Sequence, residues 1–368
     1  MDFGLSDDQK LLRDTTCRVL ADHGGFEQRE AAMASERGWS AALWGQLART
    51  GLTGLVAPEQ HGGFGGGAVE TMVVMEALGR SLALEPWLET CVLCTGLLLE
   101  GEARDLLLPG IVAGGITVSL AQFERRSRHD LADVSTVARA AEGGFALDGG
   151  KTLVLHGDSA RWFVVSARLD GEIALFLVEA QGAGVSLRGY RTQDGRRAAE
   201  IGFAGAKATL LAGPERGLAL LERARDTAIA GLCAEAVGAM SLAHELTVEY
   251  LKIRKQFGVA IGSFQALQHR AADMYIALEQ ARSMAMLAAM ALAEEPESRA
   301  RQVRAAKIQI GRSGKFIGQQ AVQLHGGIGV TMDYALGHAF KRLAMIDAMH
   351  GDADHHLGLL AGGPSILA

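Results

Sequence analysis

The sequence predicts a mainly α-helical protein with a central β domain. Apolar residues follow helical spacing up to about residue 115, form short β-type runs from 116 to about 212, and return to helical spacing from 213 to 368. With 368 residues, 49% of them hydrophobic, the chain has material for more than one hydrophobic core. We therefore expect an N-terminal helical domain (1–115), a middle β-barrel or small antiparallel sheet (116–212) and a C-terminal helical bundle (213–368).

The N-terminal region is interrupted by few helix breakers. Pro58, Pro86 and Pro109 are expected to end helices, because proline lacks the backbone N–H that an interior helical position needs. The glycine-rich segment 61–67 could cradle a phosphate, but it lacks the Lys-Ser/Thr ending of a P-loop. We interpret it as a flexible loop between two helices.

The middle region carries the strand signals. Short β-type runs are separated by glycine and aspartate turn residues at intervals of eight to fourteen positions, which is typical of a small sheet or barrel. The runs that we expect to be strands are Phe145–Leu147, Trp162–Val165, Ile173–Val178 and Ala199–Phe203.

The C-terminal region predicts long helices packed in a bundle. One apolar seam repeats at intervals of four and three residues, and its alanines indicate that helices approach closely. Its positions are Leu267, Ala271, Met274, Leu278, Ala281, Ala285 and Ala288. Pro296 is expected to end this helix.

Charge and composition exclude several classes of partner. The net charge of −6 argues against nucleic acid or an anionic membrane as a general partner. The acidic start of the chain does not look like a signal peptide, and we see no run of 18 apolar residues, so we expect no membrane span and a cytoplasmic location.

The cysteine and histidine pattern does not predict a metal site. Cys91 and Cys94 have zinc-ligand spacing, but no second pair completes a site, so we expect buried thiols on an apolar helix. The adjacent His355 and His356 cannot both face one ion from a helix.

Two distant segments predict a clamp for a dinucleotide pyrophosphate. The first is Arg254–Gly258 followed by Gln265, and the second is Gln323–Gly329. A guanidinium grips phosphate oxygens in a bidentate manner, and glycine-rich backbone can offer N–H groups to the same anion. An ordinary cation at a helix C-terminus is the alternative for Arg254.

These segments resemble the acyl-CoA dehydrogenase family over essentially the whole chain. Further likeness lies in 52–58, 76–80 and 147–151, and a narrower likeness to the small subunits of pimeloyl-CoA dehydrogenases lies in 69–72, 154–160 and 351–357. The resemblance implies an N-terminal helical domain, a middle β-barrel and a C-terminal four-helix bundle. It also implies FAD, oxidation of an acyl-CoA to the trans-2-enoyl thioester, and an electron-transfer flavoprotein as acceptor. The residues that it implies for FAD are Arg254, Gln256, Phe257, Gln265, Gln323, Gly326 and Gly327.

The chain departs from the family in two places. Family members carry an uncharged loop against the flavin and the thioester, and an ungapped comparison places residues 126–133 of this chain at that position. The Trp-Ile-Thr of the family is replaced by Leu153-Val154-Leu155, whose side chains cannot hydrogen-bond the edge of a flavin. Where members carry the catalytic glutamate, this chain has His350, and the position that some relatives use instead is Ala228. His350 and Asp352 are the candidates for a shifted base, and a surface role is the alternative.

Two other groups of charged residues call for an interpretation. The cations Arg126 and Arg128, with Arg125, could face CoA phosphates or the distal carboxylate of a dicarboxylic acyl group, or could lie on a solvated loop. Glu235 lies among apolar residues, so we expect it to be paired and structural.

The sequence therefore favours one subunit of an acyl-CoA dehydrogenase that works with a larger, unlike subunit. That partner would supply the base and the floor of the flavin site, and the substrate would be a bulky or dicarboxylic acyl-CoA. One alternative is a self-sufficient homotetramer with a shifted base. The other is a scaffold subunit that has lost flavin.

Overall fold

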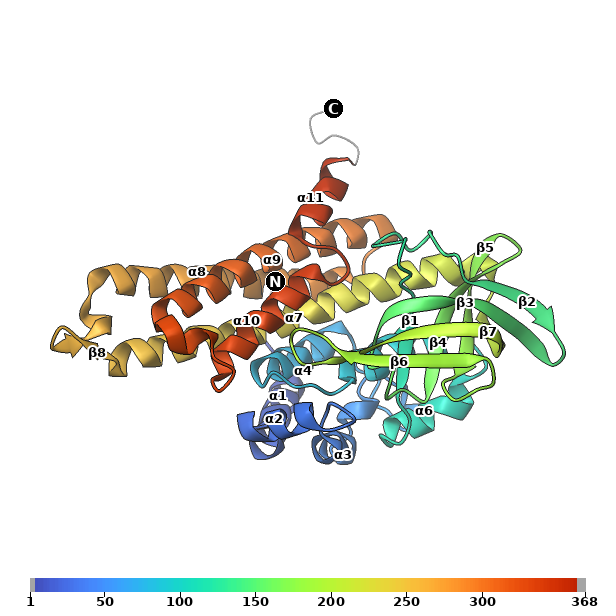
Figure 1. Ribbon diagram of the computed structural model, residues 1–368, viewed down its shortest axis with the longest axis horizontal. Helices are drawn as coiled ribbons and strands as arrows, with labels where there is room; N and C mark the ends of the chain where they lie inside the picture. Colours follow the sequence, from blue (N-terminus) through green and yellow to red (C-terminus); the bar gives the residue numbers. More distant parts are fainter. Residues whose placement is uncertain (1–3, 363–368) are drawn as a thin grey trace. The chain divides into compact units, whose positions relative to one another are not determined.

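The computed structural model describes residues 4–362, and in that range helices, strands and helices follow one another along the chain (Figure 1). The seven strands of the central sheet lie between Val118 and Ala212, with helices before and after them, and a short two-stranded hairpin interrupts the C-terminal helices. The predicted fold class, mainly α with a central β domain, is confirmed.

The N-terminal helices begin with a well-capped element. The Ser6 hydroxyl accepts a hydrogen bond from the Gln9 N–H, and the Gln9 side-chain oxygen accepts one from the Ser6 N–H, which is the capping box that starts α1. The helices of this region are α1 (Asp7–His23), α2 (Phe26–Ala34), α3 (Ala41–Arg49), η1 (Leu52–Gly54), η2 (Glu59–His61), α4 (Ala68–Arg80), the π-helix η3 (Trp87–Cys94), α5 (Thr95–Leu98) and α6 (Arg104–Val112).

One N-terminal prediction needs correction and another is refined. Pro109 lies inside α6, because its carbonyl still accepts the Ala113 N–H at 3.0 Å and the helix continues past it. The segment 61–67 connects η2 to α4 as a loop, as predicted, and hydrogen bonds from Gly65 and Gly66 to the carbonyls of Ala57 and Leu55 hold it in place. A Cβ on Gly63 would lie 2.0 Å from the Ala57 carbonyl oxygen, so glycine is required there by close backbone packing.

The strands close into a barrel. The ring runs β4–β2–β3–β7–β5 and returns to β4, while β1 pairs with β4 and β6 with β7. Most pairings are antiparallel, but β1 and β2 are parallel to β4, which the predicted antiparallel arrangement missed. All four predicted strand runs lie in strands. The strands are β1 (Val118–Ala121), β2 (Val137–Ala141), β3 (Gly144–Leu155), β4 (Trp162–Leu169), β5 (Glu172–Glu179), β6 (Val185–Arg191) and β7 (Arg197–Ala212).

The C-terminal region is a bundle of long helices. In the predicted seam of α8, Met274, Leu278, Ala281, Ala285 and Ala288 are buried, whereas the first two positions are half-buried. Pro296 does not end α8; it is the first residue of α9, where a helix needs no N–H from it. The elements are α7 (Pro214–Ile253), β8 (Lys255–Gln256), β9 (Val259–Ala260), η4 (Ile261–Ser263), α8 (Gln265–Ala291), α9 (Pro296–His325), η5 (Gly326–Val330), α10 (Ala335–Ala348) and α11 (Ala353–Ala361).

The helix α7 is long and apolar enough to pass a test for membrane-spanning segments. Its best window has a mean hydropathy of 1.2, but 83% of that window is buried inside the fold. This burial is typical of the core helix of a folded domain. All four cysteines are free, and Cys91 and Cys94 are buried, as predicted for packing thiols.

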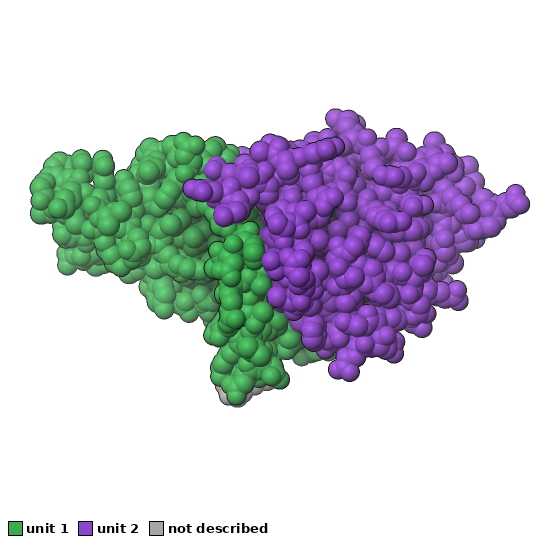
Figure 2. All heavy atoms as spheres, turned by 90° about the horizontal axis from the view of Figure 1, so that it is seen from below, with its two compact units in different colours: residues 1–26, 68–83, 229–368 green, residues 27–67, 84–228 purple. Residues whose placement is uncertain are grey.

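The chain divides into two compact units, which Figure 2 colours separately. One unit contains residues 1–26, 68–83 and 229–368, and the other contains residues 27–67 and 84–228. Within the first unit, α4 and α7 touch through glycines. A Cβ on Gly79 would lie 2.0 Å from the Glu235 carbonyl oxygen, and one on Gly238 equally close to that of Glu76. These glycines let the two backbones meet.

Candidate cofactor site

The two predicted clamp segments lie at one end of the bundle. The ring of Tyr250, near the end of α7, stacks on the ring of His325, the last residue of α9, with centroids 4.5 Å apart. Arg254 lies one helical turn after Tyr250 and donates its backbone N–H to the Tyr250 carbonyl at 2.9 Å. Gly326 follows His325 directly. The fold therefore brings together segments that are some seventy residues apart in the sequence.

Arg254 stands at the base of a small hairpin. The Ile261 N–H donates to the Arg254 carbonyl at 2.8 Å, and the strands β8 and β9 pair beyond it. Phe257 and Gly258 both have positive φ, 54° and 83°, as the tightest hairpin turns require. The Arg254 side chain is exposed, and no acidic side chain in residues 4–362 forms an ion pair with it. Its guanidinium is therefore available to an anion.

The glycines of the second segment leave room above the backbone. Gly326 has a φ of 66°, which favours glycine, and a Cβ on Gly326 or Gly327 would meet no atom within 4 Å. The side chains of Gln323 and Gln265 are exposed in the same part of the bundle, at the end of α9 and the start of α8. An open glycine backbone, a side-chain amide and an arginine without an acidic partner are the groups that a pyrophosphate needs.

Gln256 and Phe257 lie at the tip of the hairpin. The Gln256 amide donates to the Lys255 carbonyl at 2.8 Å, and Phe257 is 91% exposed, with an edge contact to Phe264 at 6.2 Å.

His325 was not identified from the sequence as a separate feature. Its Nδ1 lies 2.9 Å from the Ala321 carbonyl, and its ring is held between Tyr250 and Tyr334. Burial lowers the pKa of His325, so the ring is neutral at pH 7. Its role here is to join the ends of α7 and α9.

The candidate bases His350 and Asp352 lie at the turn between α10 and α11. His350 is buried with a φ of 56°, and its carbonyl accepts a hydrogen bond from His356 Nε2 at 3.0 Å. The Asp352 carboxylate caps α11 by accepting the His355 N–H at 2.8 Å. Burial, reinforced by the nearby Lys307 charge, lowers the pKa of His356 to about 3. This turn is fixed by its own hydrogen bonds.

A buried lysine fixes the same turn from the middle of α9. Lys307 is fully buried and donates to the carbonyls of Ile346 and Asp347 at the end of α10, at 2.8 Å in the second case. Burial lowers the pKa of Lys307 to about 8. Lys307 and Gly326 are nineteen residues apart, which is about 28 Å along a helix. The fold does not bring the candidate bases to the clamp.

The loop that carries Arg125, Arg126 and Arg128 lies in the unit that contains residues 27–67 and 84–228, and hydrogen bonds of the Glu124 side chain hold its base. The Glu124 carboxylate accepts from the backbone N–H groups of Ser135 and Thr136 at 2.8 and 3.0 Å and from Lys151 Nζ at 2.8 Å. Although burial opposes its ionisation, the Lys151 charge lowers the pKa of Glu124 to about 2, while burial lowers the pKa of Lys151 to about 8. Sequence reasoning missed this pair because the two residues are 27 positions apart.

On this loop Arg126 and Arg128 are exposed, and neither forms an ion pair with an acidic side chain in the described part of the chain. Arg128 has a φ of 48°. The neighbouring Arg125 is different, because it pairs with Glu200 at 3.3 Å. The structure thus leaves two guanidiniums available on a fixed loop, and their role toward a substrate stays a prediction.

Glu235 is paired, as predicted. Its two carboxylate oxygens accept from Arg342 Nε and NH2 at 2.7 and 2.6 Å, and the side chains are 0% and 4% exposed. The pair joins α7 to α10 in a bidentate arrangement. Both charged groups therefore serve to hold the two helices together.

The family models of three acyl-CoA dehydrogenase domains match the chain. These are the N-terminal domain at residues 6–115, the middle domain at 119–204 and the C-terminal domain at 215–363. It is 32% identical over 337 residues to the acyl-CoA dehydrogenase IpdE2 of Mycobacterium tuberculosis, with 91% of each chain covered. The chain belongs to the acyl-CoA dehydrogenase family, which is a family of flavoprotein oxidoreductases. Solved structures of the same fold include PigA in complex with FAD, at 24% identity and TM-scores of 0.88 and 0.87.

The names of two similar solved structures each list two different proteins. The Tcur3481–Tcur3483 steroid acyl-CoA dehydrogenase matches with 30% identity and a TM-score of 0.89, over 96% of each chain. The ChsE4–ChsE5 complex from Mycobacterium tuberculosis matches with 27% identity and a TM-score of 0.90, over 99% of this chain and 100% of that chain.

Proposed function

We propose that this chain is the partner subunit of a heteromeric acyl-CoA dehydrogenase and that it supplies the clamp for the FAD pyrophosphate. The observation that carries the proposal is the end of the bundle, where the Tyr250–His325 stack joins the segment of Arg254 to the open backbone of Gly326 and Gly327, and where no acidic side chain in residues 4–362 pairs with Arg254. The complexes of unlike chains among the similar structures support the division into two subunits.

The clamp residues have separate tasks. The Arg254 guanidinium would hold phosphate oxygens with two parallel N–H donors, and the N–H groups near Gly326 and Gly327 would approach the same anion without a side chain in the way. Gln265 and Gln323 would donate or accept hydrogen bonds beside it. FAD, when bound, would supply the redox chemistry of α,β-dehydrogenation, with an electron-transfer flavoprotein as its acceptor.

The base is assigned to the partner subunit. Removing a proton next to a thioester needs a group whose protonation state and position are free to change. In this chain Asp352 holds the first turn of α11, and His350 lies in a turn fixed by Lys307 and His356. Neither arrangement is suited to proton transfer.

The substrate is proposed to be bulky or dicarboxylic. Arg126 and Arg128 would face an anionic group of the acyl-CoA, either a CoA phosphate or a distal carboxylate. The steroid enzyme among the similar structures supports a bulky acyl group. Because all four cysteines are free thiols, we expect the complex to work in the cytoplasm.

Substitutions at the α10–α11 turn test where the base is. His350→Asn should tolerate the positive φ, and Asp352→Asn should keep the helix cap, so both variants are expected to fold. In the assembled enzyme each should change turnover by less than about tenfold, well below the 10²–10⁴-fold associated with a lost general base. A thousandfold loss at normal flavin content would make this chain the catalytic subunit.

A further inference from the structure

His325 lies at the junction of the two clamp segments, directly before Gly326. Its imidazole ring is buried between two phenol rings. The ring centroid of Tyr250, from α7, is 4.5 Å away, and that of Tyr334, the residue before α10, is 5.5 Å away. Because the face of an aromatic ring attracts a cation, a charged imidazolium would be favoured at this place between the two rings.

The polar surroundings of the ring also suit an imidazolium. Nδ1 lies 2.9 Å from the Ala321 carbonyl oxygen, and the Leu246 carbonyl is a second one that is near enough to favour the charged ring. Nε2 is buried and has no hydrogen bond of normal geometry within residues 4–362. A neutral imidazole has a single N–H donor, whereas a protonated ring has an N–H on each nitrogen and could serve both carbonyls.

Burial is the effect that opposes protonation of His325. It lowers the pKa of the ring, while the carbonyls of Ala321 and Leu246 act in the opposite direction. The groups that face the ring are these carbonyls and the phenols of Tyr250 and Tyr334, and no charged side chain in residues 4–362 contributes to the pKa. A negative charge brought near the ring would therefore shift the balance toward imidazolium.

A bound pyrophosphate would bring such a charge. It carries one negative charge on each phosphate group, and Arg254 supplies a single positive charge against them. Gly326 and Gly327 can offer N–H groups but no charge. Since the stack of Tyr250 on His325 joins the Arg254 segment to these glycines, an anion held by both segments would lie close to the imidazole.

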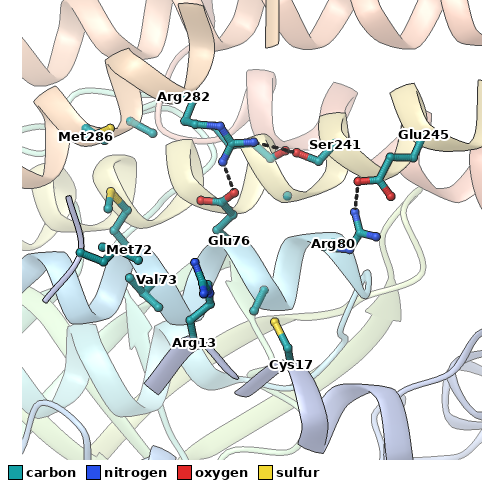
Figure 3. Close-up of a pocket in the computed structure, with 15 residues that line it drawn as sticks. Arg13, Cys17, Met72, Val73, Glu76, Arg80, Ser241, Glu245, Arg282 and Met286 are labelled. Atoms are coloured by element: carbon teal, nitrogen blue, oxygen red, sulfur yellow. Dashed lines mark hydrogen bonds and ion pairs between the residues drawn. The ribbon is translucent and has the colours of Figure 1, made fainter. Parts of the chain in front are cut away.

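The second positive charge does not come from the arginines of the cavity between α1, α4, α7 and α8, which Figure 3 shows in the same unit. Arg80 pairs there with Glu245, and Arg282 pairs with both Glu76 and Glu279. These guanidiniums are held by carboxylates of their own, so they are not available to a second phosphate group.

We propose that His325 is a further member of the clamp, which takes up a proton from solvent when the FAD pyrophosphate binds. The imidazolium then balances the second negative charge at the place where the ends of α7 and α9 meet. This role of His325 rests on the proposed function of the clamp and adds a proton that binds together with the cofactor.

The direction of the pH dependence follows from the two states of the ring. The pKa of His325 is lowered in the free clamp, and the bound anion would raise it, so a proton is taken up on binding at pH values between the two. FAD itself has no group that titrates near neutral pH. The affinity for FAD should therefore fall as the pH rises through this window and become constant above it.

Titration of the co-expressed complex with FAD, after its flavin has been removed, tests this role. We expect the affinity to fall at least threefold from about pH 5.5 to about pH 8. Calorimetry near the middle of this range, in two buffers of different ionisation enthalpy, should show net proton uptake of up to one proton for each FAD bound. His325→Phe keeps an aromatic ring between the two tyrosines but cannot be protonated, so both the pH dependence and the proton uptake should disappear.

His244→Phe is the matched control. His244 lies on α7 six residues before Tyr250, or about 9 Å of helix; its ring contacts that of Tyr275 at 5.7 Å, and its Nε2 lies 3.3 Å from the Ala271 carbonyl. This variant should keep the pH dependence of the unsubstituted complex.

Two results would overturn the role of His325. One is an FAD affinity that is constant over this pH range without proton uptake, while Arg254→Ala still weakens binding. The other is a pH dependence that persists in His325→Phe. If Arg254→Ala left the FAD affinity unchanged, the clamp itself would be removed, and this role with it.

Discussion

Replacing Arg254 by alanine is expected to lower the FAD content of the assembled enzyme at least tenfold. The exposed Arg254 guanidinium has no acidic partner in the described chain, so its loss removes a phosphate contact and breaks no internal ion pair. Truncating one member of a desolvated charge pair costs ~2–5 kcal/mol, and about 1.4 kcal/mol corresponds to a tenfold change in affinity. The ratio of flavin absorbance to protein absorbance measures the effect.

Two further substitutions make this result specific. Lys255→Ala removes a neighbouring exposed charge from the same hairpin and should change flavin content by less than about twofold. Arg254→Lys keeps the charge but loses the bidentate geometry, so it should fall between the two. Normal flavin content in Arg254→Ala would remove the pyrophosphate assignment.

The second large effect is expected at the buried Glu235–Arg342 pair. Arg342→Met leaves the Glu235 carboxylate buried without its partner, which typically costs about 3–5 kcal/mol of unfolding free energy. Urea unfolding followed by circular dichroism measures the loss. Poor soluble yield at 37 °C would be the same effect in the cell.

The double variant Glu235→Leu, Arg342→Met distinguishes a buried charge from a packing defect. Because replacing a whole buried ion pair by apolar residues is often neutral, it should regain most of the stability. As a control, Arg80→Ala breaks the half-exposed pair with Glu245 and should cost no more than about 1 kcal/mol. If Arg342→Met unfolded like the unsubstituted chain, the pair would have no structural role.

The fold could be predicted from local sequence because its elements have clear periods. The seam of α8 and the four strand runs follow from hydrophobic spacing alone. The parallel pairing of β1 and β2 with β4 could not be predicted, because strand direction in a barrel depends on long-range closure. The positions of Pro109 and Pro296 were misjudged because proline was interpreted as a helix end, although proline is tolerated in a first turn, where Pro296 lies, and α6 continues past Pro109.

The sequence motif points to the residue types of the candidate site, and their roles toward a cofactor stay predictions. The free guanidinium of Arg254 and the open Gly326 agree with the sequence motif, but the Tyr250–His325 contact depends on the relative positions of two helices. The cap formed by Asp352 could have been anticipated, since an aspartate before a helix commonly accepts its N–H groups. Lys307 could not, because a lysine in a helical pattern is usually exposed.

The flavin spectrum of the chain, purified alone and after co-expression with a larger acyl-CoA dehydrogenase subunit, tests the division of the active site most directly. A clamp without a flavin floor has part of the contacts, and a weakly bound ligand stabilises its protein little. The chain alone should therefore be pale and inactive with acyl-CoA substrates, and the co-expressed complex should be yellow with fewer flavins than subunits. An isolated chain that forms a yellow tetramer with one FAD per subunit, and that bleaches when an acyl-CoA is added, would contradict the account.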